Sequence, residues 1–148
     1  MGKIVIKWPE LGLSVKCDSI DENKDAYDVL AANLPIRTVQ GHEMVGGWVL
    51  RDRSVHFSKK SFDLAKQDMK EATMKELPEG TIALLSPQGT TSELLIKYSD
   101  SADDRKYVPI AKVEDADLEI LKKAGKKVWQ SYIRTHEVIT CEIERGEE

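Results

Sequence analysis

Alternating apolar and polar residues at the start of the chain predict two β-strands joined by a tight turn. Ile4, Ile6 and Trp8 occupy every second position of residues 3–8, and apolar residues alternate again along residues 13–17. The sequence between them, PELG, combines proline with glycine and is typical of a turn. We therefore expect residues 3–17 to form a β-hairpin.

Two segments have the period of an amphipathic helix. The sequence Ser19-Ile20-Asp21-Glu22 matches a capping box and predicts a helix start, and Pro35 is expected to end this helix. The apolar residues that would share one of its faces are Ala26, Tyr27, Leu30 and Leu34. A clearer helix is expected over residues 115–134, because acidic residues open it and basic residues lie toward its end, as the helix dipole favours.

Two features of the helical segments leave alternatives open. Gly125 lies in the apolar seam of the helix at 115–134, where glycine costs roughly 1 kcal/mol relative to alanine. It marks either close packing or a break. Residues 58–77 are polar and rich in lysine, with apolar residues at helical spacing, so they form either a helix or a long ordered excursion.

Short apolar runs bounded by glycine, proline and charged residues predict the other strands. These runs cover residues 36–40, 48–50, 54–57, 81–85, 93–98, 107–113 and 138–143. The sequence Arg51-Asp52-Arg53 is interpreted as a polar turn, and residues 87–91 and 100–106 as loops.

The order of these elements predicts a mostly β fold. About eight strands and two or three helices follow one another without the regular alternation of a doubly wound parallel sheet. A closed or nearly closed barrel, with helices covering its open ends, would protect the sheet edges. We expect residues 1–148 to form a single domain of this kind.

Composition and charge narrow the class of protein. The 148 residues are 41% hydrophobic and 32% charged, which is typical of a globular domain. The net charge of -4 disfavours a nucleic-acid partner. No apolar run is long enough to cross a bilayer and no signal peptide is recognisable, so a cytoplasmic protein without a membrane partner is expected. Cys17 and Cys141 are expected to be reduced and partly buried, unless their strands pair and allow a disulfide bridge.

Several well-known catalytic and cofactor motifs are missing from the sequence. His42-Glu43 does not begin an HExxH zinc motif, because residue 46 is glycine, and the three histidines lack ligand spacing. The sequence also lacks a phosphate-binding loop, a GxGxxG fingerprint and a GxSxG nucleophile elbow. We therefore expect no metal and no cofactor.

Residues 40–57 hold the greatest concentration of groups capable of chemistry. His42 and Glu43 can transfer protons, Trp48 offers a flat apolar wall, and Arg51 and Arg53 can bind carboxylates. His56 adds a second imidazole. The alternative is an ordinary strand-turn-strand in which the tryptophan is core, the arginines are solvated and His42 forms a local hydrogen bond.

A second cluster lies in residues 86–91. Ser86 and Gln88 could present a hydroxyl and an amide at the rim of a substrate site. The alternative is an ordinary hairpin loop.

Several stretches of the sequence together resemble a known family. They are KIVIKWPELGLSVKCDSIDENKDAYDVLAANLPI, GHEMVGGWVLRDRSVHF, LLSPQGTTSELLIKYSD and KKAGKKVWQSYIRTHEVITCEIE. In this order they resemble the small cyclophilin-like β-barrel proteins of bacteria, in particular the barrel region of the cucumopine and mikimopine synthases. The Phe-His-Arg run of prolyl-isomerase cyclophilins is absent, so the resemblance does not extend to isomerase activity.

The resemblance implies a closed eight-stranded barrel with helices packed on its ends. It also implies a Pictet–Spengler condensation without a redox cofactor, in which the amine of histidine forms an imine with 2-oxoglutarate and an imidazole carbon then closes a ring. The predicted partners are accordingly an amino acid and a 2-oxo acid.

The candidate residues can be given roles in such a reaction. His42 or Glu43 would remove the ring proton, and the other, or His56, would protonate the departing hydroxyl. Arg51 or Arg53 would hold a substrate carboxylate, and Trp48 would exclude water. Two alternatives remain: a barrel that binds a metabolite or peptide without chemistry, and a structural component that forms homo-oligomers.

Overall fold

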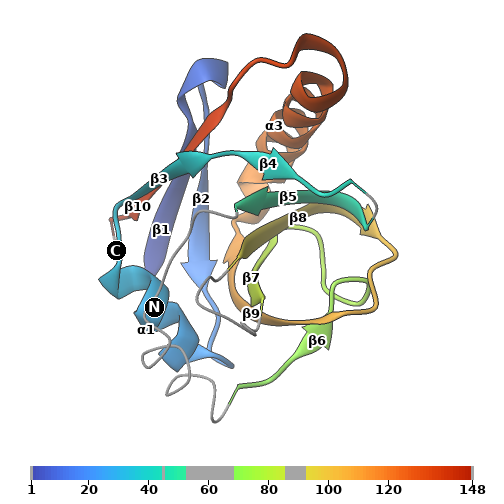
Figure 1. Cartoon of the computed structure of the whole chain (residues 1–148). Coiled ribbons are helices and arrows are strands. Elements are labelled where there is room, and N and C mark those ends of the chain that lie inside the picture. Colours follow the sequence, from blue (N-terminus) through green and yellow to red (C-terminus); the bar gives the residue numbers. More distant parts are fainter. Residues whose placement is uncertain (1, 45, 53–68, 86–92, 148) are drawn as a thin grey trace.

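One antiparallel sheet makes up most of the computed structural model, which describes residues 2–44, 46–52, 69–85 and 93–147. Its strands are β1 (Lys3–Trp8), β2 (Leu13–Ser19), β3 (Ile36–Val39), β4 (Gly41–His42), β5 (Gly47–Asp52), β6 (Ala72–Thr73), β7 (Thr81–Leu85), β8 (Leu94–Ser101), β9 (Lys106–Val113) and β10 (Thr140–Arg145). They are ordered β3-β10-β1-β2-β9-β7-β8-β5-β4, and β6 pairs with β9 outside this path (Figure 1).

The two ends of this path are neighbours in the chain. Only Gln40 separates β3, which pairs with β10, from β4, which pairs with β5. The backbone N–H of Gln40 donates to the carbonyl of Ile139 (2.7 Å), and its side-chain oxygen accepts a hydrogen bond from Trp8 Nε1 (2.8 Å). One stretch of chain therefore nearly closes the sheet into a barrel, which confirms the predicted mostly β fold.

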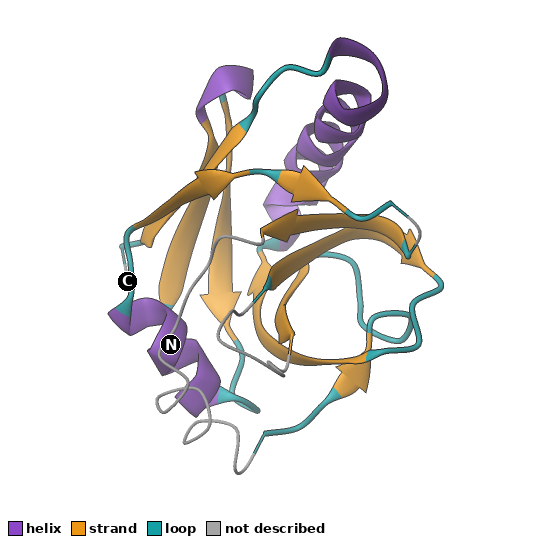
Figure 2. Ribbon diagram, in the orientation of Figure 1, coloured by secondary structure: helices purple, strands orange, loops and turns teal. Residues whose placement is uncertain are grey.

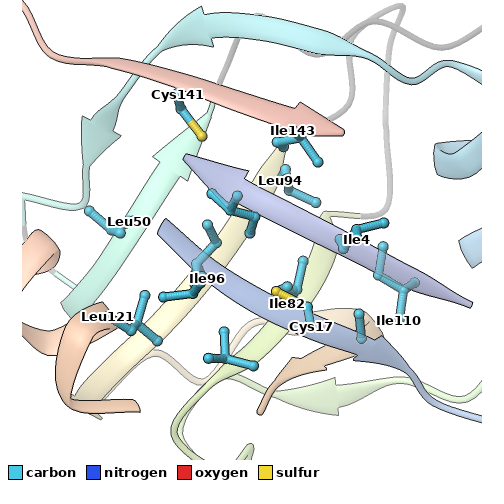
Figure 3. Close-up of a cluster of buried hydrophobic side chains, with 14 of the residues drawn as sticks. Ile4, Cys17, Leu50, Ile82, Leu94, Ile96, Ile110, Leu121, Cys141 and Ile143 are labelled. Atoms are coloured by element: carbon cyan, nitrogen blue, oxygen red, sulfur yellow. The ribbon is translucent and has the colours of Figure 1, made fainter. Parts of the chain in front are cut away.

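The barrel interior is filled by apolar side chains. Alternate residues of β1 (Ile4, Ile6 and Trp8) are buried, as their spacing predicts. Figure 3 shows side chains of β1, β2 and β10 meeting those of β5, β7 and β8. Strand β1 lies between the strands of Cys17 and Cys141, and both thiols are free and buried. The predicted disulfide alternative is therefore not realised.

Helices cover the barrel (Figure 2). They are α1 (Lys24–Ala32) and α3 (Leu118–Gln130), with short turns η1 (Pro9–Leu11), η2 (Asp115–Asp117) and η3 (Ser131–Thr135). Helix α1 begins later than predicted, because Ser19 ends β2 and its Oγ accepts a hydrogen bond from Gly2 N (2.8 Å). The predicted capping box is therefore wrong. Among the described residues, no helix is both long and apolar enough to cross a membrane.

Helix α3 packs closely on the sheet at Gly125. A Cβ atom at this position would lie 2.5 Å from Cδ1 of Tyr98 on β8, and the helix continues past it without a break. The close-packing interpretation of Gly125 is thus correct. The contact places the second half of α3 beside β4, β5 and β8.

Of four further predicted segments, one is corrected, one is decided between its two alternatives, and two lie outside the described residues. Arg51 and Asp52 belong to β5 and do not form a turn. Within the segment 58–77, the described residues 69–77 form β6 and a turn, which agrees with the ordered excursion and not with the helix. The Lys97 ammonium holds this turn by donating to the carbonyls of Met74 (2.8 Å) and Leu77 (2.6 Å). The predicted strand at 54–57 and loop at 87–91 are among the residues that the structure does not describe.

Candidate functional site

The β4–β5 hairpin has two faces of different chemistry. His42 lies opposite Leu50 in the strand register, and Gly41 lies opposite Arg51. Because successive residues point to opposite sides of a strand, His42 shares the inner face with Leu50 and Asp52. Glu43 and Arg51 line the outer face.

The outer face opens on a hollow of about 680 Å³, which we call the charged hollow. It is lined by Glu43, Arg51, Asp103, Asp104 and Arg105, with Met44, Gly46 and Ala102 completing its wall. Residues 102–105 follow β8, so the hollow joins two segments that lie far apart in the sequence. In a ligand pocket, polar and charged groups that converge on the cavity fix the orientation of a bound molecule.

Glu43 is the most deeply buried acid of the charged hollow. Its residue is only 4% exposed, and its Oε1 lies 3.5 Å from Nη2 of Arg105. Burial raises the pKa of Glu43, while the positive charges of Arg51 and Arg105 only partly oppose this shift. The carboxyl therefore holds its proton closer to neutral pH than an exposed glutamate does, as general acids require.

The two arginines of the hollow are each paired with another carboxylate. Arg51 donates to Oε2 of Glu93 from Nε (2.9 Å) and from Nη2. Arg105 Nη2 lies 3.0 Å from Oδ2 of Asp103, which also accepts a hydrogen bond from the Tyr107 hydroxyl. The Arg105 side chain is 55% exposed, so its guanidinium can reach a ligand from this fixed position.

On the inner face of the hairpin, both ring nitrogens of His42 have hydrogen-bond partners. Its Nδ1 lies 2.6 Å from the Glu43 carbonyl, and its Nε2 lies 2.7 Å from the Tyr98 hydroxyl. Because a carbonyl only accepts, Nδ1 must carry the proton and Nε2 accepts from Tyr98. Burial lowers the pKa of His42, which favours this neutral form. Neither nitrogen is free to exchange a proton with a substrate.

Three further aromatic rings surround His42. Trp129 lies 4.8 Å from it between ring centroids, Tyr98 5.6 Å and Trp48 6.2 Å. Trp48 and Trp129 meet edge to face at 5.7 Å. Beside these rings lies a cavity of about 410 Å³, which we call the aromatic pocket. Its lining consists of Trp48, Tyr98, Ser99, Lys122, Lys126, Trp129 and Gln130.

Asp52 is a buried carboxyl that the sequence interpretation missed. It is 0% exposed, and within the described residues neither carboxyl oxygen has a hydrogen-bond partner. Burial raises the pKa of Asp52 to about 8, and the nearby Gln40 side chain opposes the shift only in part. Continuing the alternation of Trp48 and Leu50 by one step would have placed Asp52 on the inner face.

The predicted site residues therefore divide into separate groups. Glu43 and Arg51 share the charged hollow, whereas His42 and Trp48 lie on the aromatic side. The other predicted residues, Arg53, His56, Ser86 and Gln88, lie outside the described residues.

Sequence reasoning also missed Asp103 and Arg105, because it interpreted residues 100–106 only as a charged loop. Two acidic residues followed by two basic residues, at positions 103–106, were the available signal. In the described part of the chain, no group of three or more His, Cys, Asp or Glu side chains could hold a metal ion.

Comparison with known proteins places the fold among solved structures. No family model matches the chain, and no curated protein does. The fold is similar to that in a structure of McbB in complex with tryptophan, with a TM-score of 0.84 and 23% sequence identity. The match covers 98% of this chain and 45% of the McbB chain, so the protein spans slightly less than half of that length. At this identity the likeness establishes a shared barrel fold.

Proposed function

We propose that the protein is a small-molecule enzyme that condenses an amino acid with a 2-oxo acid in the charged hollow by a Pictet–Spengler reaction. The observation that carries the proposal is Glu43, a nearly buried carboxyl with a raised pKa that lines a hollow beside two arginines. The resemblance of the sequence to the cucumopine and mikimopine synthases suggests histidine and 2-oxoglutarate as substrates. The tryptophan bound to McbB, an amino acid with a nucleophilic ring, is compatible with this class.

One carboxyl group can serve both proton transfers of this reaction. The substrate amine first adds to the ketone and forms a carbinolamine. Protonated Glu43 then gives its proton to the hydroxyl, so that the C–O bond breaks, water leaves and an iminium ion remains. A ring carbon of the amino acid attacks the iminium carbon, and the Glu43 carboxylate takes the proton from that ring carbon. The proton balance closes within one turnover.

The arginines would position the substrate carboxylates. Arg105 is the better placed, because more than half of its side chain is exposed and, within the described residues, its Nη1 donates no hydrogen bond. Arg51 is held against Glu93 and would act mainly through its charge. A guanidinium binds a carboxylate with charge and geometry together, and such positioning lowers the barrier to reaction.

Not all of the residues predicted from the sequence keep a role in the proposed reaction. His42 is replaced by Glu43 as the proton carrier, because both of its nitrogens are occupied. Trp48 lies on the opposite face of the hairpin from Glu43 and is not assigned to the condensation. Arg53, Ser86 and Gln88 remain proposed substrate contacts, and His56 remains a proposed proton donor.

Mass spectrometry of reaction mixtures tests the proposal. The protein is incubated with 2-oxoglutarate and either histidine or tryptophan, and the product expected is the sum of both substrates less one water. Its rate of formation should exceed that of protein-free and Glu43→Gln controls. Product at the uncatalysed rate with both amino acids would contradict the proposal. Thermal stabilisation by a substrate without product would instead support the binding-module alternative.

A further inference from the structure

The aromatic pocket lies on the opposite side of the β4–β5 hairpin from the charged hollow and has a chemistry of its own. We propose that it is a second binding site, which takes a small planar aromatic carboxylate. This proposal is independent of the condensation reaction, because none of the residues that line the aromatic pocket lines the charged hollow.

The walls of the pocket are suited to a flat ring. Trp48 is 43% exposed although it lies beside Trp129 and Tyr98, so part of a large apolar face is open to solvent. Exposed aromatic surface that rims a cavity is a common mark of a ligand site. A planar ring entering here would contact aromatic faces and edges, which is the favoured geometry of ring pairs.

The rings are fixed in place before any ligand arrives. The Tyr98 hydroxyl is held by Nε2 of His42, and Gly125 brings α3 against the Tyr98 ring. Trp129 follows Gly125 by about one helical turn and packs on His42. Little free energy is therefore needed to order the side chains of the pocket when a ligand binds, which favours binding.

The positive charge at the rim of the pocket favours a ligand that carries a carboxylate. Lys122 and Lys126 are one helical turn apart on α3 and both line the pocket. Lys122 is paired with Glu79 at 3.1 Å, whereas Lys126 has no ion pair among the residues that the structure describes. The rim therefore has uncompensated positive charge, which repels a cationic ligand and attracts a carboxylate on the ring.

Tryptophan indole signals in a ¹⁵N NMR titration test this site. The chain has three tryptophans, and Trp8 is fully buried with its Nε1 bonded to Gln40, so its signal is an internal control. Naphthalene-2-carboxylate should shift the signals of Trp48 and Trp129 in a saturable way and leave Trp8 unchanged. Cyclohexanecarboxylate, which lacks the aromatic ring, and naphthalene-2-methanol, which lacks the negative charge, should both bind more weakly.

Matched variants locate the binding groups. Lys126→Gln should weaken binding about two- to fivefold, as for an exposed ion pair. Lys127 is an exposed neighbour that does not line the pocket, so Lys127→Gln should leave the affinity for the ligand unchanged. Trp48→Leu should weaken binding about three- to tenfold through loss of ring contact. Because Trp48 is partly exposed, the variant should fold.

Three results would overturn the proposal. The first is no saturable shift of Trp48 or Trp129. The second is equal affinity for the carboxylate and the alcohol. The third is a shift that survives Lys126→Gln but disappears in Arg105→Gln, because that would assign the ligand to the charged hollow.

Discussion

The two faces of the β4–β5 hairpin use similar residue types in opposite ways. On the inner face, His42 has both nitrogens bonded and Asp52 lies in the barrel core. On the outer face, Glu43 is almost as buried, yet it lines a hollow that arginines share. Burial raises the pKa of both carboxyl groups, but Glu43 lines the charged hollow, whereas Asp52 is completely shielded from solvent.

The comparison teaches that a perturbed titratable group is a candidate for chemistry only where a ligand can reach it. On the inner face, His42 packs on Trp129 and bonds the Tyr98 hydroxyl, so it supports the rings of the aromatic pocket. The outer face has the acid, the cations and the space that the proposed condensation needs.

Replacing Asp52 tests the inner face most strongly. Because its pKa is raised by burial, the folded state keeps a proton that the unfolded chain loses above about pH 4. The stability of the folded state should therefore fall as pH rises from about 4 to 8, by up to ~1.4 kcal/mol for each pH unit. Asp52→Asn should lack this part of the pH dependence in urea unfolding followed from pH 5 to 8.

The exposed carboxyl of Asp104 gives the matched control. Asp104→Asn should keep the pH dependence of the wild type. If the stability difference between Asp52→Asn and the wild type did not grow with pH, the Asp52 carboxyl would not be protonated in the folded barrel.

Truncating His42 should mainly reduce stability. His42→Ala removes a buried ring from the aromatic cluster and leaves the Tyr98 hydroxyl without its partner. We expect the free energy of unfolding to fall by about 2–4 kcal/mol. Chemical denaturation measures this loss, with Met44→Ala at an exposed neighbouring position as the control. A fully stable variant with no activity would return His42 to the reaction.

Removing the exposed cation of the outer face should change substrate binding more than stability. Arg105→Gln should raise KM for the 2-oxo acid about tenfold, because a charge-assisted hydrogen bond to its carboxylate is lost. Lys106→Gln, the same change of charge at the next residue, should leave KM unchanged. Equal effects of the two variants would show that only net charge matters.

Local patterns in the sequence predicted much of the fold. Alternating residues identified the strands of the N-terminal hairpin and of β10, because burial on one face imposes that period. The capping box failed because Ser19 Oγ is used by the Gly2 N–H, a contact between distant segments. Asp52 was misplaced because a run of three charged residues is typical of a turn, whereas here it continues a strand.

The candidate site was only half predictable for the same reason. Glu43 and Arg51 belong to one hairpin, so a local pattern could identify them together. Arg105, which pairs with Glu43, lies in the segment that follows β8. Tyr98, whose hydroxyl is hydrogen-bonded to Nε2 of His42, lies within β8. Such pairings depend on the barrel topology, which a local pattern does not contain.

The rate of condensation by Glu43→Gln decides whether the outer face of the hairpin is the reaction site. The amide keeps the shape of the side chain and removes its ability to exchange a proton, so kcat/KM for condensation should fall about 10²–10⁴-fold. The free energy of unfolding should stay within about 1 kcal/mol of the wild type. Glu137→Gln, the same change of side chain at an exposed position that does not line the hollow, should leave kcat/KM within about threefold. Wild-type turnover by Glu43→Gln would contradict the assignment of the outer face as the reaction site.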